Sequence, residues 1–194
     1  MQNLPDKMKV LGLILAGGQS KRFGKDNKLL HPLDGKPLIK HIADRLASLD
    51  LSARAAVVSS PDVAKELPEY DILWTEKEIP LQSESLSIGL RHAMRSTYTH
   101  VLVVLGDMPF VSKSTLLGVI KKGSGDTPAA ATNGRRTMPP ALFPRACIAE
   151  ILSAGTNPET AKEMLRSLPK SQLVFSSDGE LFDIDTKADL NRLP

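Results

Sequence analysis

Two groups of residues in this sequence have the types and spacing to bind an anionic ligand and its counter-cation. The first group follows the apolar run Val10–Leu15 and reads Ala16-Gly17-Gly18-Gln19-Ser20. Glycine lets the backbone approach a ligand closely, because no Cβ stands in the way. Successive N–H groups of such a turn can point together at an anion, and Arg22, Lys25 and Lys28 add positive charge. A triphosphate requires this combination of backbone donors and cations.

The glycine spacing excludes the two commonest phosphate-binding motifs. The dinucleotide fingerprint needs G-x-G-x-x-G, and the P-loop needs G-K-[ST] at the start of a helix. Neither pattern occurs in residues 15–24. The alternative interpretation of the loop is a strand-to-loop turn that carries exposed basic residues. The loop therefore does not decide between these two possibilities by itself.

The second group consists of carboxylates. Asp107 follows the fully apolar run Val101–Leu105, and magnesium binds through one or two carboxylates together with phosphates and water. Asp183 and Asp185 are alternate residues, so in an extended segment both point to the same side. Two other interpretations stay open: Asp107 can start a turn before a proline, and Asp185 can cap a final helix.

Buried strands and amphipathic helices must position these groups. Continuous apolar runs predict buried strands, and apolar residues at helical spacing predict helices. Strands are predicted at residues 10–16, 55–58, 72–74, 101–105, 129–132, 141–143, 173–175 and 181–183. Helices are predicted at residues 37–49, 61–67, 85–94, 114–120, 146–154, 160–168 and 187–193. This alternation predicts an α/β fold with a mostly parallel central sheet, in which ligands bind at the carboxyl ends of strands.

Composition and charge narrow the class of protein. The 194 residues are 41% hydrophobic and 24% charged, which is typical of a single globular domain over residues 1–194. A net charge of +3 from 25 basic and 22 acidic residues is too balanced to indicate nucleic-acid binding. The basic pairs Lys121-Lys122 and Arg135-Arg136 are interpreted as solvated surface.

Cysteine content and hydropathy predict the compartment. The single cysteine, Cys147, excludes a disulfide framework or a cysteine-rich zinc site within the chain. The run Val10–Leu15 is too short to cross a membrane, and no secretory signal precedes it. We expect a cytoplasmic protein that has no membrane partner and is a monomer or a weak homo-oligomer.

Several motifs together resemble a known family. Leu15–Gly24, Lys28-Leu29-Leu30 and Gly35–Leu38 resemble the signature of the MobA/MocA-like NTP transferases, a branch of the nucleoside-diphospho-sugar transferase-like superfamily. Gly106–Pro109 and Asp183–Thr186 resemble the two metal-site motifs of that branch. The resemblance covers the chain from about residue 10 to about residue 190. It implies a single-domain, Rossmann-like three-layer αβα sandwich.

The resemblance also implies residue roles. Nucleotide binding falls on Leu15, Ala16, Gly17, Gly18, Ser20, Arg22, Lys28, Ser85 and Asp107. The implied catalytic residues are Arg22, Lys28 and Asp107. The implied ligands of a Mg²⁺ ion are Asp107 and Asp185, with Asp183 as an alternative ligand. Three residues separate Gly24 from Lys28, where the family commonly has two, so Lys25 can take the role of Lys28.

The implied reaction is the transfer of a nucleoside monophosphate from an NTP to a phosphorylated acceptor, with release of pyrophosphate. The acceptor phosphate is already an anion, so catalysis depends on positioning and charge neutralisation. Leu15 resembles the guanylyltransferase version of the loop, whereas Ser85–Ser87 and Asp183–Asp185 resemble the cytidylyltransferase version, so GTP and CTP both stay open. Molybdopterin is the expected acceptor, although Met138-Pro139 stands where the family has Gly-His.

Three other functions are compatible with these motifs. The first is another NTP transferase of the superfamily, with a sugar phosphate or a similar acceptor. The second is a metal-dependent glycosyltransferase, because Asp183-Ile184-Asp185 is formally a D-x-D motif. The third is a non-catalytic nucleotide-binding module. Release of pyrophosphate from an NTP distinguishes nucleotidyl transfer from the last two.

Overall fold

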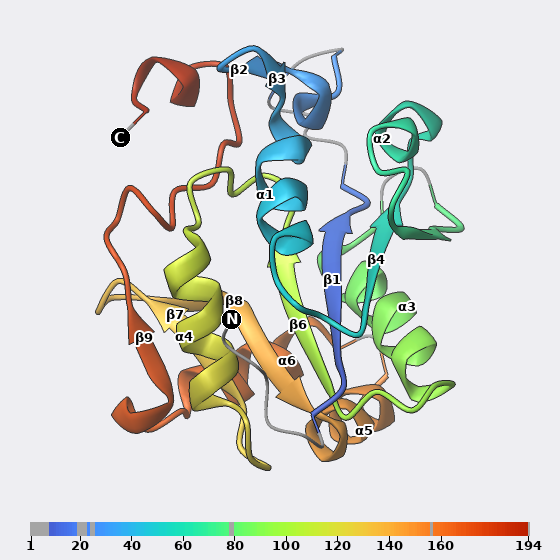
Figure 1. Ribbon diagram of the computed structural model, residues 1–194, viewed down its shortest axis with the longest axis vertical. Helices are drawn as coiled ribbons and strands as arrows, with labels where there is room; N and C mark the ends of the chain where they lie inside the picture. Colours follow the sequence, from blue (N-terminus) through green and yellow to red (C-terminus); the bar gives the residue numbers. More distant parts are fainter. Residues whose placement is uncertain (1–7, 19–22, 24–25, 78–79, 156, 194) are drawn as a thin grey trace.

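A seven-stranded, mostly parallel sheet forms the centre of the molecule (Figure 1), as the sequence predicts. The computed structural model describes residues 8–18, 23, 26–77, 80–155 and 157–193. The strand order is β5-β4-β1-β6-β8-β7-β9. Its strands are β1 (Val10–Ala16), β4 (Ala53–Val58), β5 (Asp71–Trp74), β6 (His100–Leu105), β7 (Ala129–Thr132), β8 (Thr137–Pro144) and β9 (Leu173–Phe175). Only β8 runs antiparallel to its two neighbours, β6 and β7.

Helices cover both faces of the sheet and make three layers. The α-helices are α1 (Leu38–Ala47), α2 (Pro61–Lys65), α3 (Gln82–Met94), α4 (Lys113–Lys122), α5 (Arg145–Ser153) and α6 (Pro158–Arg166). One hydrophobic core joins the sheet to α1, α2 and α4, and a second core joins it to α3, α5 and α6. Short 3-10 helices lie at Lys28–Leu30, Lys170–Gln172 and Asp189–Asn191, and β2 (Pro32–Leu33) pairs with β3 (Lys36–Pro37) in a small ribbon. Within the described ranges, no helix has the length and apolar character needed to span a bilayer.

The two strands that lead to the predicted site are buried on both faces. All seven residues of β1 are buried, and β1 lies between β4 and β6 in parallel register. Helix α3 packs closely on β1 at Gly89, where an added Cβ would lie 2.3 Å from Leu13 Cδ2. This close approach brings the first turn of α3, with Ser85, to the carboxyl end of β1.

The last part of the chain differs from the sequence prediction. The strand predicted at 181–183 is wrong, because these residues form a turn and an irregular segment. The helix predicted at 187–193 is also wrong, except for the 3-10 turn Asp189–Asn191. The segment is ordered instead by single hydrogen bonds: Ile184 N–H donates to the Asp107 carbonyl at 3.0 Å, and the Asp189 carboxylate accepts from Thr186 N at 2.7 Å.

Strand β8 is longer than predicted. It begins at Thr137 and runs through Pro139-Pro140, which are joined by a cis peptide bond. Proline lacks the N–H donor of a regular ladder, and the pairing with β7 shifts register between Ala130 and Ala131. The sequence prediction of a strand at 141–143 therefore recovered only the apolar part of this element.

Candidate active site

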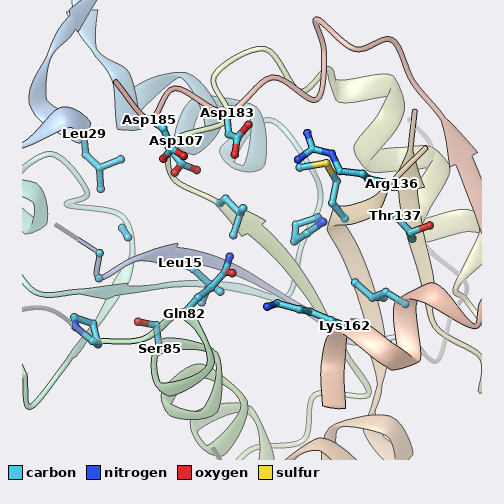
Figure 2. Close-up of a pocket in the computed structure, with 18 of the residues that line it drawn as sticks. Leu15, Leu29, Gln82, Ser85, Asp107, Arg136, Thr137, Lys162, Asp183 and Asp185 are labelled. Atoms are coloured by element: carbon cyan, nitrogen blue, oxygen red, sulfur yellow. The ribbon is translucent and has the colours of Figure 1, made fainter. Parts of the chain in front are cut away.

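A cavity of about 880 Å³ opens at the carboxyl ends of β1 and β6. Most of the residues predicted from the sequence line this one cavity, namely Leu15, Ala16, Gly17, Gly18, Lys28, Ser85, Asp107 and Asp185. Ser20, Arg22 and Lys25 lie outside the described residues, so their predicted roles stay predictions. Figure 2 shows the carboxylates on one side of the cavity and Ser85 with Gln82 on another.

The two loop glycines have different surroundings. A Cβ on Gly17 would lie 2.8 Å from Ser85 Oγ and 3.0 Å from Thr75 Cγ2. A Cβ on Gly18 would meet nothing within 4 Å. Gly17 is therefore required by crowding between the loop and the start of α3, whereas the Gly18 backbone is exposed toward the cavity.

Lys28 occupies the centre of the acidic side of the cavity. It begins the 3-10 helix Lys28–Leu30, whose first turn is capped by the Asn27 side chain, which accepts a hydrogen bond from Leu29 N at 3.1 Å. The Lys28 side chain is 7% exposed, and its Nζ donates to Asp107 Oδ2 at 2.7 Å and to Asp185 Oδ1 at 2.9 Å. A single ammonium thus bridges two carboxylates that are far apart in the sequence.

This bridge shifts the pKa values of Lys28 and Asp107. Burial by itself lowers the pKa of Lys28, but the attraction of Asp107 and Asp185 outweighs burial and raises the pKa above its ordinary value. Burial raises the pKa of Asp107, the Lys28 charge opposes this rise, and repulsion from Asp183 and Asp185 adds to it. Lys28 and the acids that surround it are therefore electrostatically coupled.

Backbone contacts hold the second carboxylate in place. Ile184 is fully buried, and its N–H donates to the Asp107 carbonyl. On either side of this anchor, Asp183 and Asp185 both line the cavity, as their alternation in the sequence predicts. The carboxylate of Asp189 accepts a hydrogen bond from Asp185 N at 3.0 Å, which fixes the backbone of the segment.

The donor set fits a hard divalent cation. The Oδ1 atom of Asp107 is buried and has no hydrogen-bond partner among the described residues, which leaves a carboxylate oxygen free to bind a cation. Across the described ranges, no group of three or more His, Cys, Asp or Glu side chains forms a metal site by itself. A cation held by one or two carboxylates and completed by phosphate oxygens and water is magnesium-like.

Comparison with known proteins places the chain in a family. The MobA-like NTP transferase domain matches residues 12–173. The chain belongs to this family. A probable molybdenum cofactor guanylyltransferase from Pyrococcus horikoshii is 39% identical over 120 residues, which is 59% of this chain and 57% of that protein. The bifunctional protein GlmU from Rhizobium rhizogenes is 33% identical over 141 residues, which is 70% of this chain and 31% of that protein.

The fold is shared with solved structures at lower identity. Rv0371C from Mycobacterium tuberculosis H37Rv, solved in complex with manganese, has a TM-score of 0.77 and 19% sequence identity, with 96% of this chain and 98% of that chain covered. This likeness shows the fold alone. The chain spans about half the length of the Pyrococcus horikoshii relative and about a third of the length of the Rhizobium rhizogenes relative.

The sequence prediction missed several cavity residues of this family member. They are Gln82 and Pro80 beside the glycine loop, and Arg135, Arg136, Thr137, Lys162 and Arg166 on the far side. The pair Arg135-Arg136 is exposed, as its interpretation as solvated surface predicts, but the prediction missed that both residues also line the cavity. Lys162 and Arg166 are four residues apart on α6, a spacing that puts both on one side of a helix but does not distinguish a cavity from solvent.

Proposed function

We propose that this protein transfers a nucleoside monophosphate from a Mg²⁺-bound NTP to a phosphorylated acceptor and releases pyrophosphate. The observation that supports this function is the convergence of Lys28, Asp107 and Asp185 beside the Gly17 loop, in a cavity large enough for a nucleotide and a small acceptor. Cavities that hold drug-sized ligands have volumes of roughly 300–1,000 Å³. The family membership supports the same reaction class.

Each part of the cavity has a task in this reaction. The backbone at Gly17 and Gly18 orients the triphosphate. The charge of Lys28, together with Arg22, balances the phosphates. Asp107 and Asp185 would hold the Mg²⁺ ion, which would supply charge stabilisation at the phosphates. An oxygen of the acceptor phosphate attacks the α-phosphorus, the new O–P bond forms, and the bond to the β-phosphate oxygen breaks so that pyrophosphate leaves.

GTP with molybdopterin is the substrate pair that the relatives favour. The Pyrococcus horikoshii relative is named a probable molybdenum cofactor guanylyltransferase. CTP stays a possible donor because Ser85–Ser87 and Asp183–Asp185 resemble the cytidylyl branch. A sugar phosphate, which the resemblance to the wider superfamily leaves open, is the second acceptor to test.

The deciding experiment measures pyrophosphate release for each of the four NTPs, with molybdopterin and with a sugar phosphate as acceptor. Turnover with GTP or CTP and molybdopterin is expected. Transfer from a UDP-sugar without pyrophosphate would instead support a glycosyltransferase, and NTP binding without any turnover would support a nucleotide-binding module.

A substitution tests the site assignment. The variant Asp107→Asn should lower turnover on the order of a hundredfold or more, because the cation loses a charged ligand and the transition state loses its charge stabilisation. The exposed Asp126, which lies outside the cavity, provides the matched control Asp126→Asn. Turnover of Asp107→Asn equal to that of the control would remove Asp107 from the catalytic machinery.

A further inference from the structure

Away from Asp107 and Lys28, the cavity is lined by four cationic side chains from two separate elements. Arg135 and Arg136 come from the turn between β7 and β8, and Lys162 and Arg166 come from α6. Figure 2 shows Arg136 beyond Asp183 as seen from Asp107, and Lys162 on the side of Gln82 with its ammonium directed into the open space. We call these four residues the cationic wall.

The turn that carries the two arginines is fixed by its own hydrogen bonds. The Asn133 side chain accepts from Arg135 N at 3.0 Å and from Arg136 N at 2.8 Å. The Thr132 hydroxyl donates to the Arg136 carbonyl at 2.8 Å, and Gly134 supplies the positive φ of 86° that the turn needs. Within the described ranges, neither guanidinium forms a hydrogen bond or an ion pair of its own, so both are available to a ligand.

On helix α6, the other two cationic side chains both form ion pairs with one glutamate. Glu159 pairs with Lys162 and with Arg166, each at 3.2 Å. The helix is anchored by Leu165, which is 6% exposed, and by the Asn157 side chain, which accepts from Glu159 N at 3.1 Å. Glu159 is the one carboxylate that pairs with the cationic wall in the described part of the chain, so the wall keeps a positive excess.

The position of the wall separates it from the chemistry at the α-phosphorus. In a near-attack geometry the reacting phosphate lies about 3–3.5 Å from the atom that it attacks. Under the proposed function that atom lies near Lys28 and Asp107, on the acidic side. Cations farther along the cavity therefore face a part of the acceptor other than the attacking phosphate.

We propose that the cationic wall is a subsite for a second anionic group of the acceptor, so that the preferred acceptor carries two separated anionic groups. This inference rests on the proposed function and makes it more specific. Charge-assisted hydrogen bonds from arginine and lysine bind phosphate and other anionic oxygens. An acceptor with only its attacking phosphate leaves the wall unused and binds more weakly.

Kinetics of a double variant test the subsite. Lys162→Gln with Arg166→Gln removes two wall charges from side chains that are 52% and 64% exposed, and glutamine is a good helix former. We expect the KM for an acceptor with two anionic groups to rise roughly tenfold to a hundredfold, which is the size of one or two charge-assisted hydrogen bonds. The affinity for NTP with Mn²⁺, and kcat at saturating acceptor, should stay within about threefold of wild type.

A matched control separates the subsite from general electrostatics. Lys121→Gln with Lys122→Gln removes the same charge from exposed positions on α4, outside the cavity, and should leave the acceptor KM unchanged. An acceptor with a single phosphate should show no difference between the two double variants. If wild type turns over and the wall variant keeps the wild-type KM for the doubly anionic acceptor, the subsite is refuted while the proposed function stands.

If wild type shows no turnover, the proposed function is refuted, and a chemical probe then tests the anion subsite by itself. Pyridoxal 5′-phosphate carries a phosphate and an aldehyde, which forms an imine with a lysine amine, releases water and is trapped by borohydride reduction. Mass spectrometry should find Lys162 labelled ahead of the exposed Lys121 and Lys122, and this preference should disappear in Arg135→Gln with Arg136→Gln. Equal labelling of Lys162 and Lys121 in wild type would then overturn the anion subsite.

Discussion

The variant Lys28→Met removes the ammonium that bridges two carboxylates of the cavity. Methionine has nearly the same length and suits a buried position, so the change isolates the charge. In wild type the Nζ atom lies 2.7 Å from Asp107 Oδ2 and 2.9 Å from Asp185 Oδ1. Without it, like charges face each other in a partly buried site, and the folded state is destabilised.

The contacts give the size of this effect. Removing one partner of a buried ion pair costs about 3–5 kcal/mol, because the remaining charge is left uncompensated. The Asp185 side chain is 34% exposed and keeps part of its hydration, so we expect the lower end, about 3 kcal/mol. For a chain of 194 residues, each kcal/mol lowers the melting temperature by about 2–4 °C, which predicts a fall of roughly 6–12 °C.

A divalent cation should reverse the loss. With Lys28 gone, the ammonium no longer competes with a cation for the two carboxylates, and Mn²⁺ without NTP should bind Lys28→Met at least about tenfold more tightly than wild type. At about 100 times its Kd, the ion adds about 2.7 kcal/mol of stability. Thermal unfolding with and without Mn²⁺, together with Mn²⁺ titration followed by electron paramagnetic resonance, measures both quantities. Turnover of Lys28→Met should nevertheless fall about a hundredfold or more, because the variant lacks the ammonium group that balances the charge of the phosphates.

The surface variant Lys36→Met is the control. Lys36 pairs with Asp44 at 2.6 Å, but the two side chains are 39% and 47% exposed, and such a pair contributes at most about 1 kcal/mol. If Lys28→Met melts at the same temperature as this control, the bridge does not stabilise the fold. If Mn²⁺ stabilises Lys28→Met no more than wild type, the carboxylates are not a cation site.

Three further predictions concern the supports of the cavity. Gly17→Ala should weaken NTP binding by about tenfold or more in a titration, because its Cβ would lie 2.8 Å from Ser85 Oγ. The control is Gly18→Ala, whose Cβ would meet nothing within 4 Å, and equal NTP affinity of the two variants would contradict the prediction. Gly89→Ala should lower the free energy of unfolding in urea by about 1–3 kcal/mol through overpacking against β1; an unchanged denaturation midpoint would show that α3 can shift. Burial by itself raises the pKa of Glu180, but hydrogen bonds, including one from Ser112 N at 2.8 Å, outweigh burial and lower this pKa below 4.5. The ionised Glu180 carboxylate therefore stabilises the fold above pH 4.5, and this stabilisation is lost as the pH falls through the pKa of the folded state. Glu180→Gln should therefore be less stable than wild type at neutral pH and lose less stability on acidification, and parallel stability curves from pH 6 to pH 3 would refute the linkage.

Strong local patterns made the centre of the fold predictable from sequence. Strands β1 and β6 are covered on both faces, so they read as unbroken apolar runs, and their ends place Ala16 and Asp107 at the cavity. The alternation Asp183-Ile184-Asp185 was also informative: Ile184 is buried, and both acids line the cavity. The segment is nevertheless not a strand, since its N–H groups bond to Asp107 and Asp189 instead of a neighbouring strand.

Other parts of the site depend on contacts between distant residues. Spacing alone left Lys25 and Lys28 as alternatives, and only the folded chain brings Lys28 to Asp185, 157 residues away. Lys162 and Arg166 look like any exposed pair on an amphipathic helix, because a sequence does not state which side of a polar face meets a cavity. The cationic wall was missed for the same reason.

The hydrogen bond from Ile184 to Asp107 joins two parts of the cavity that lie far apart in the sequence. Every strand of the sheet ends at or before Phe175, whereas the second carboxylate that Lys28 contacts belongs to Asp185. A single proteolytic cut between Phe175 and Asp183 would therefore leave all the strands in one fragment and Asp185 in the other. Retention of the two fragments in one complex would then depend on the buried side chains of Leu181 and Ile184.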